Sequence, residues 1–155
     1  MRIKKGNVLN EERGIIVHGC NCYNNNGMPV FGAGIAREIR ERFPSAYQAQ
    51  EFVIRKRGSL TLGNISTAMI DRDMKYIINA NTQQETGYGR QVSYDAIDVC
   101  FRKVKEFRFE NELDHLPVIF PMIGAGLGGG SWRVIQTIIE EIFPDPEDTT
   151  LFVLE

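Results

Sequence analysis

The chain has 155 residues, 43% hydrophobic and 25% charged, which argues against general disorder, and no apolar run reaches the roughly 18 residues that span a bilayer. Its net charge of −2, from 18 basic and 20 acidic residues, argues against non-specific nucleic-acid binding, which needs a surplus of cations. The three cysteines lack the spacing of a disulfide or zinc framework, which predicts free thiols, no metal site and a cytoplasmic location.

Strand-like and helix-like segments alternate along the chain, which is typical of a layered α/β fold. The segment 14–19 predicts a buried central strand because β-branched residues stand between two glycines. Pro44 is expected to separate two consecutive helices. In chain order, the predicted elements are a weak strand at 3–8, a strand at 14–19, a loop at 21–31, helices at 35–43 and 45–55, strands at 64–70 and 76–80 joined by a turn at 72–73, a loop at 82–91, a helix at 94–107 capped by Ser93, a strand at 117–120, a loop at 124–130, a helix at 132–142 capped by Ser131, and a strand at 150–154.

The most conspicuous pattern is the segment 124–130, which holds five of the chain's 15 glycines. It joins a buried strand to the start of a helix, where glycines let backbone N–H groups approach an anion that the helix dipole also favours. A second glycine patch, 32–34, also opens a helix, so the two patches could hold a diphosphate from both sides. The alternative is that both patches are connections without a ligand.

His18 and Asn21 are the candidate catalytic residues. His18 closes the strand 14–19, and side chains at the carboxyl end of a strand in an open α/β sheet face the usual ligand crevice. There a histidine can act as a general acid or base, although it can also simply pack in the core. The amide of Asn21 suits sugar hydroxyls. Cys20, expected on the same face as His18, is a weaker candidate nucleophile because no activating group is identified.

Taken together, several segments resemble the macrodomain family, and the similarity runs in order along essentially the whole chain. The resemblance implies a three-layer α/β/α fold with a mixed central sheet, formed by residues 1–155 as a single macrodomain. It also implies binding of ADP-ribose or its 1″-phosphate, with no further cofactor. The segments that carry the resemblance are Gly6–Leu9, Ile16–Asn21, Gly32–Ala36 and Pro121–Trp132.

The resemblance further implies positions for the ligand. Val8 would line the adenine site, and Asn21 would contact the distal ribose. The two glycine patches would surround the diphosphate and the distal ribose, through Gly32, Ala33, Gly34 and Ile35 on one side and through Gly124, Ala125, Gly126, Leu127 and Gly128 on the other.

Within the family, the chain resembles the branch of ADP-ribose 1″-phosphate phosphatases and lysine-dependent ADP-ribosyl glycohydrolases. The glycohydrolases carry a lysine where this chain reads 81–84 without one, and some carry an aspartate at the position of Gly128. Both departures favour hydrolysis of ADP-ribose 1″-phosphate, with His18 and Asn21 as the catalytic residues. Two alternatives stay open: removal of ADP-ribose from protein or DNA, and binding of ADP-ribose without chemistry.

Overall fold

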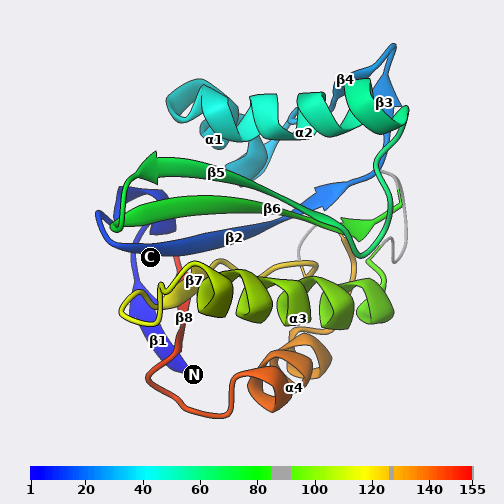
Figure 1. Cartoon of the computed structure of the whole chain (residues 1–155). Coiled ribbons are helices and arrows are strands. Elements are labelled where there is room, and N and C mark those ends of the chain that lie inside the picture. The colour runs from blue at the N-terminus through cyan, green and yellow to red at the C-terminus, as the bar shows by residue number, and fades with distance from the viewer. Residues whose placement is uncertain (85–91, 126–127, 155) are drawn as a thin grey trace.

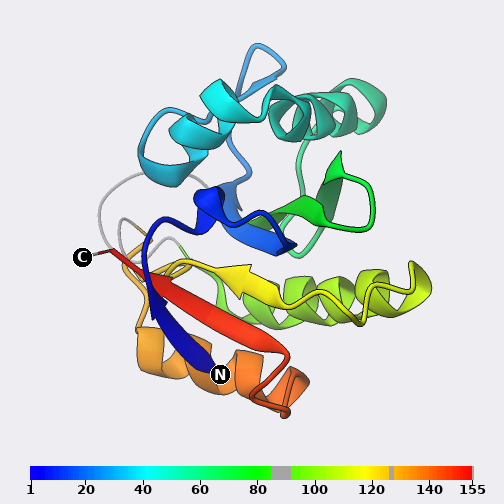
Figure 2. The same ribbon diagram turned by 90° about the vertical axis from the view of Figure 1, so that its left-hand side faces the viewer.

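A six-stranded mixed sheet forms the middle of the computed structural model, which describes residues 1–84, 92–125 and 128–154 (Figure 1). In spatial order the strands are β1 (Arg2–Lys5), β8 (Thr149–Val153), β7 (Val118–Phe120), β2 (Gly14–Asn21), β6 (Lys75–Gln83) and β5 (Ile65–Asp71). The first five run parallel to one another, and β5 pairs antiparallel with β6 in a hairpin. Strands from the two ends of the chain, β1 and β8, lie side by side (Figure 2).

Helices cover both faces of this sheet, which confirms the predicted three-layer fold (Figures 1 and 2). One face carries α1 (Gly34–Arg42) and α2 (Pro44–Arg57), and the other carries α3 (Tyr94–Glu110) and α4 (Trp132–Ile142). Because side chains alternate along a strand, β2 contributes to two hydrophobic clusters. Ile15 and Val17 belong to the cluster that includes α3 and α4 residues, whereas Ile16 belongs to the cluster under α1 and α2.

Several boundaries differ from the sequence prediction by a few residues, and three differences bear on the site. The first strand ends at Lys5, and Val8 lies in a short 3-10 helix, Val8–Asn10, whose Leu9 N–H donates to Asn7 Oδ1 at 2.9 Å. The predicted loop at 21–31 contains a small hairpin of β3 (Asn24–Asn25) and β4 (Met28–Pro29). Strand β6 continues to Gln83, beyond the predicted end at 80, because pairing with β2 holds this polar stretch in the sheet.

All four helices start within one residue of the predicted positions, but the two serines predicted as caps differ in their hydrogen bonds. Ser93 caps α3, since its Oγ accepts from Ala96 N at 3.1 Å. Ser131 occupies the N-cap position of α4 without a capping bond from its side chain, and its N–H donates to Tyr94 Oη at 3.0 Å. Pro44 opens α2 as expected.

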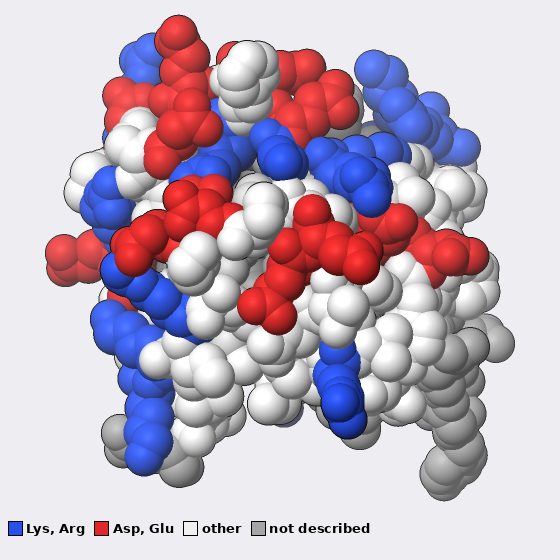
Figure 3. Space-filling view, turned by 90° about the horizontal axis from the view of Figure 1, so that it is seen from below, with Lys and Arg blue, Asp and Glu red and all other residues white. Residues whose placement is uncertain are grey.

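Basic and acidic side chains are interspersed on the face seen in Figure 3. Among the described residues, four of the eight ion pairs join side chains one helical turn apart, Arg37–Glu41 and Arg102–Asp98 among them. Such exposed pairs contribute little to stability. Within the described part of the chain, no helix is long and apolar enough to cross a membrane.

Candidate ligand-binding site

A cavity of ≈ 620 Å³ opens at the carboxyl ends of four neighbouring strands, β8, β7, β2 and β6. The chain leaves β2 towards α1 and α2 on one face of the sheet and leaves β7 towards α4 on the other (Figure 1). In an open α/β sheet, neighbouring strands that send the chain to opposite faces create a crevice at their carboxyl ends. The topology of the sheet therefore explains why the cavity lies at this position. Its described lining residues are Gly19, Cys20, Asn21, Val30–Ala36, Thr82, Gln83, Pro121–Gly124, Gly128 and Leu154.

Both predicted glycine patches reach this one cavity. The residues 32–35 line it at the start of α1, and Gly124 and Gly128 line it after β7. Gly124 has φ +74°, and an added Cβ would lie 2.7 Å from Val92 Cγ2, so no other residue fits this turn without strain. Ala125 is half-buried and is not among the lining residues. Gly126 and Leu127 lie outside the described residues.

The start of α1 gives one side of the cavity an anion-binding character. Ala33 is its N-cap and has no side chain able to bond the first-turn N–H groups. Those groups carry the positive end of the helix dipole, and the first turn contains no acidic residue. An anion placed here would accept backbone hydrogen bonds without a cationic side chain.

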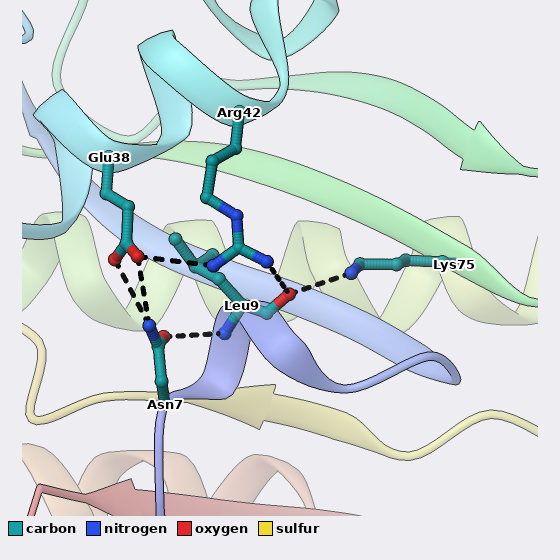
Figure 4. A network of polar contacts seen from close by, with 5 residues as sticks. All are labelled: Asn7, Leu9, Glu38, Arg42 and Lys75. Carbon is teal, nitrogen blue, oxygen red and sulfur yellow. Dashed lines mark hydrogen bonds and ion pairs between the residues drawn. The ribbon is translucent and has the colours of Figure 1, made fainter.

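A polar network ties α1 to the segment before β2 (Figure 4). Glu38 accepts from Asn7 Nδ2 at 3.0 and 3.2 Å and pairs with Arg42 at 3.2 Å. The carbonyl of Leu9 accepts from Lys75 Nζ at 2.9 Å and from Arg42 at 3.5 Å. These contacts fix the helix whose first residues line the cavity.

His18 does not face the cavity, contrary to the expectation for a strand-end side chain. Its ring is fully buried and packs edge-on against Phe31, with 5.5 Å between the ring centroids. Its Nε2 forms a hydrogen bond with Asn79 Oδ1 at 2.5 Å. Burial lowers the pKa of His18 from 6.5 to about 4, so the ring is neutral at pH 7. The physical reason is alternation: His18 points into the layer under α2, and the strand reaches the cavity only beyond it.

Asn79 joins His18 to a chain of buried hydrogen bonds. Asn79 Nδ2 donates to the Ala46 carbonyl at 2.8 Å and to Ser66 Oγ at 2.9 Å. Ser66 donates to Gln50 Oε1 at 2.8 Å, and Gln50 Nε2 donates to Asn81 Oδ1 at 2.8 Å. This network fixes the last part of β6 against α2, just before the strand reaches the cavity.

Asn21 and Thr82 are the polar side chains that the cavity leaves without protein partners. Asn21 Oδ1 and Thr82 Oγ1 are both buried, and neither has a hydrogen-bond partner among the described residues. Both residues line the cavity, on the adjacent strands β2 and β6. Sequence reasoning identified Asn21 but missed Thr82, which it placed in a loop.

Of two further residues singled out in the sequence, Val8 and Cys20, only Cys20 lines the cavity. Val8 is 2% exposed and packs in the cluster under α1 and α2, and it is not among the described lining residues. Cys20 lines the cavity with its Sγ 3.6 Å from His18 Nε2, as expected from their shared face. Burial raises the pKa of Cys20 well above its usual range, which makes its thiol a poor nucleophile.

The described lining of the cavity is uncharged. None of its described lining residues is a lysine, arginine, aspartate, glutamate or histidine. Within the described ranges, no group of three or more His, Cys, Asp or Glu side chains is arranged to hold a metal ion. Within the described lining, the groups open to a ligand are backbone groups, the side chains of Asn21, Thr82 and Gln83, and apolar surface.

Comparison with known proteins gives matches over most of the chain. The Macro domain family matches residues 17–139. The uncharacterised 17.5 kDa protein of the tk-vs intergenic region of Enterobacteria phage T4 is 30% identical over 127 residues, which are 81% of this chain and 77% of that protein. The DNA ADP-ribosyl glycohydrolase of Mycobacterium tuberculosis is 28% identical over 146 residues, 92% of this chain. The chain spans only 38% of that relative's length.

Solved structures share the fold. The macrodomain of Mycobacterium tuberculosis DarG superposes with a TM-score of 0.79 at 24% identity, covering 97% of this chain and 95% of that one. Thermosipho africanus DarTG in complex with ADP-ribose gives a TM-score of 0.74 at 16% identity, covering 99% of this chain and 42% of that one.

Proposed function

This chain belongs to the Macro domain family, and from that premise we propose that its cavity binds ADP-ribose or a derivative substituted at the 1″ position. The observation that carries the proposal is that the start of α1 and the turn after β7 border one cavity of ≈ 620 Å³. The similar fold of Thermosipho africanus DarTG, solved with ADP-ribose, supports this choice of ligand. We also propose that the 155 residues act as a single macrodomain.

The proposed ligand matches the cavity in chemistry. A diphosphate needs hydrogen-bond donors, and the first-turn N–H groups of α1 supply them at the positive end of a helix. Gly32–Ile35 would contact the diphosphate and distal ribose from one side, and residues 124–128 would contact them from the other. Asn21 would bind the distal ribose. Val8 stays a predicted contact for the adenine.

For the reaction, we propose hydrolysis of ADP-ribose 1″-phosphate. Water attacks phosphorus, the bond from phosphorus to the sugar oxygen breaks, that oxygen takes up a proton, and ADP-ribose and phosphate are released. The chain has no lysine at 81–84, which argues against the lysine-dependent alternative. Backbone N–H groups at the cavity would stabilise charge that develops on the transferred phosphate.

The part played by His18 needs its own test, because its ring is buried and bonded to Asn79. Its predicted role in proton transfer requires that His18→Ala abolish turnover while leaving ADP-ribose affinity within a few fold. Unchanged turnover would reject that role. His18→Asn is the matched variant, since an amide can still bond Asn79 but cannot transfer a proton at neutral pH.

A second candidate function is removal of ADP-ribose from DNA. It is favoured by the similarity to DNA ADP-ribosyl glycohydrolases, which extends over 92% of this chain. The activity of that longer relative is a proposal for this chain, which matches only part of it. The absence of a lysine at 81–84 counts against a lysine-dependent route.

One set of assays separates these functions. Purified protein is given ADP-ribose 1″-phosphate, ADP-ribosylated protein and ADP-ribosylated DNA in parallel, and ADP-ribose binding is measured by calorimetry. We expect binding of ADP-ribose and release of phosphate from the first substrate. Release of ADP-ribose from DNA alone would replace the phosphatase proposal by the second candidate. Binding without turnover would leave a binding module, and no binding would reject the proposed function.

A further inference from the structure

We propose that the hydroxyl of Thr82 is a specificity-determining group that hydrogen-bonds a hydroxyl of the ligand's distal ribose. This inference rests on the proposed ADP-ribose function and deepens it. Thr82 is 1% exposed and lines the cavity, and its Oγ1 has no hydrogen-bond partner among the described residues. A buried hydroxyl left unpaired is unfavourable, so a native protein that keeps one at a cavity needs a reason, and a ligand partner supplies it.

An irregularity in the sheet sets the position of Thr82. Cys20 pairs with Asn81, but the next residue of β2, Asn21, pairs with Gln83. Thr82 is therefore the extra residue of a β-bulge, and bulges beside binding sites redirect a side chain out of the regular alternation. The backbone of Thr82 is nevertheless held, because its carbonyl accepts from Ser93 N at 2.8 Å.

Gly19 keeps the space around this hydroxyl open. A Cβ added to Gly19 would lie 2.8 Å from Thr82 Oγ1 and 3.0 Å from Ile123 Cγ2. A larger residue would push the hydroxyl away from its present position. The close approach of the Gly19 backbone thus leaves room for Thr82 Oγ1 in its present position, on a residue that lines the cavity.

The chemistry of the unpaired oxygens indicates which part of the ligand they contact. Asn21 Oδ1, on the strand next to Thr82, is an acceptor and also lacks a partner within the described chain. An acceptor needs a partner that carries a hydrogen, which a diphosphate at neutral pH does not offer. A sugar hydroxyl donates and accepts, so it can bond both oxygens. Because Asn21 is assigned to the distal ribose, its neighbour Thr82 is assigned there too.

The test compares ADP-ribose with ADP, which lacks the distal ribose, by calorimetry. Thr82→Val keeps the branched shape and removes the hydroxyl. We expect it to weaken ADP-ribose binding roughly 3- to 10-fold, the equivalent of one hydrogen bond, and to leave ADP affinity unchanged. Thr82→Ser restores the hydroxyl and should return ADP-ribose affinity to within about twofold.

Thr149→Val is the matched control. Thr149 is fully buried on β8, its Oγ1 also lacks a partner in the described part of the chain, and it is not a lining residue of the cavity. The control should change neither affinity. Neither valine variant should lower the unfolding temperature of the free protein, because each removes an unpaired buried hydroxyl.

The possible outcomes are distinguishable. If unmodified protein binds no ADP-ribose, the proposed function and this inference both fail. If it binds and Thr82→Val binds equally well, only the role of Thr82 is overturned. An equal loss for ADP would place the hydroxyl against the adenosine or the diphosphate and overturn the ribose assignment. A lower unfolding temperature for Thr82→Val, with no such change for Thr149→Val, would assign the hydroxyl a structural role instead.

Discussion

Strands β2 and β6 carry two groups of buried polar side chains that differ in how they are paired. His18 and Asn79 lie side by side in the register of these strands, and Asn79 hydrogen-bonds His18, Ser66 and the Ala46 carbonyl. A few residues further on, Asn21 and Thr82 have buried oxygens without partners among the described residues. Both groups have buried polar atoms, but only the first group has hydrogen-bond partners for them within the described protein. Lack of a protein partner together with a position at the cavity therefore distinguishes the group that we propose to contact the ligand from the structural group.

The largest expected effect comes from breaking the paired group. Asn79→Ala removes three hydrogen bonds and leaves the buried His18 ring and Ser66 hydroxyl without their partner. We expect a loss of about 3 kcal/mol in the free energy of unfolding, measured by urea denaturation. A loss below about 1 kcal/mol would mean that this network contributes little, and the contrast between the two groups would disappear.

The pH dependence of stability tests the same group. Burial lowers the pKa of His18 from 6.5 to about 4, so between these values the unfolded chain binds more protons than the folded one. The contribution of His18 is fully present above pH 6.5 and is lost as the pH falls towards 4, by about 3 kcal/mol in total.

Urea titrations between pH 7 and 4 measure this loss, and a variant isolates it from the titration of carboxylates. His18→Asn should lose less stability than unmodified protein over this range, because it has no ring to protonate. Identical curves for the two proteins would show that His18 is not buried as a neutral ring.

An intermediate effect is expected at the turn after β7. Gly124→Ala must hold a φ of +74° and bring Cβ to 2.7 Å from Val92. We expect a loss of about 1–2 kcal/mol in stability. If the turn also binds the diphosphate, ADP-ribose affinity should fall roughly tenfold, about the same free energy. Gly58→Ala, at φ +86° after α2 and away from the cavity, is the control: it should lose stability but not affinity.

The smallest expected effect on stability comes from the unpaired group. Asn21→Ala removes an oxygen that has no partner in the described structure, so the free energy of unfolding should change by less than about 0.5 kcal/mol. Calorimetry should nevertheless show ADP-ribose affinity lowered roughly fivefold through a lost ligand contact. A larger change in stability than in binding would place Asn21 with the structural group.

The layered fold could be predicted from the sequence because its signals are local. The β-branched run of β2 and the helical spacing in α4 each predict their element without knowledge of the rest. The glycine patches were predictable for the same reason, since each lies where an element starts or ends. Pro44 and Ser93 marked helix starts that the structure confirms.

The direction in which individual side chains point was not predictable, because it depends on strand pairing between segments that are distant in the sequence. His18 closes an apolar run, and only the register with Asn79 and the cover of α2 show that it points inward. Thr82 belongs to a polar stretch that resembles a loop, and only the bulge opposite Cys20 and Asn21 shows where it lies. One signal could have found it: polar residues follow the apolar run of β6, just as Asn21 follows that of β2.

A crystal structure of the protein with ADP-ribose tests the central claim most directly. We expect the diphosphate to lie between the start of α1 and Gly124, with the distal ribose at Asn21 and Thr82. A nucleotide bound elsewhere, or a diphosphate that contacts neither Gly32–Ile35 nor the turn after β7, would contradict this claim.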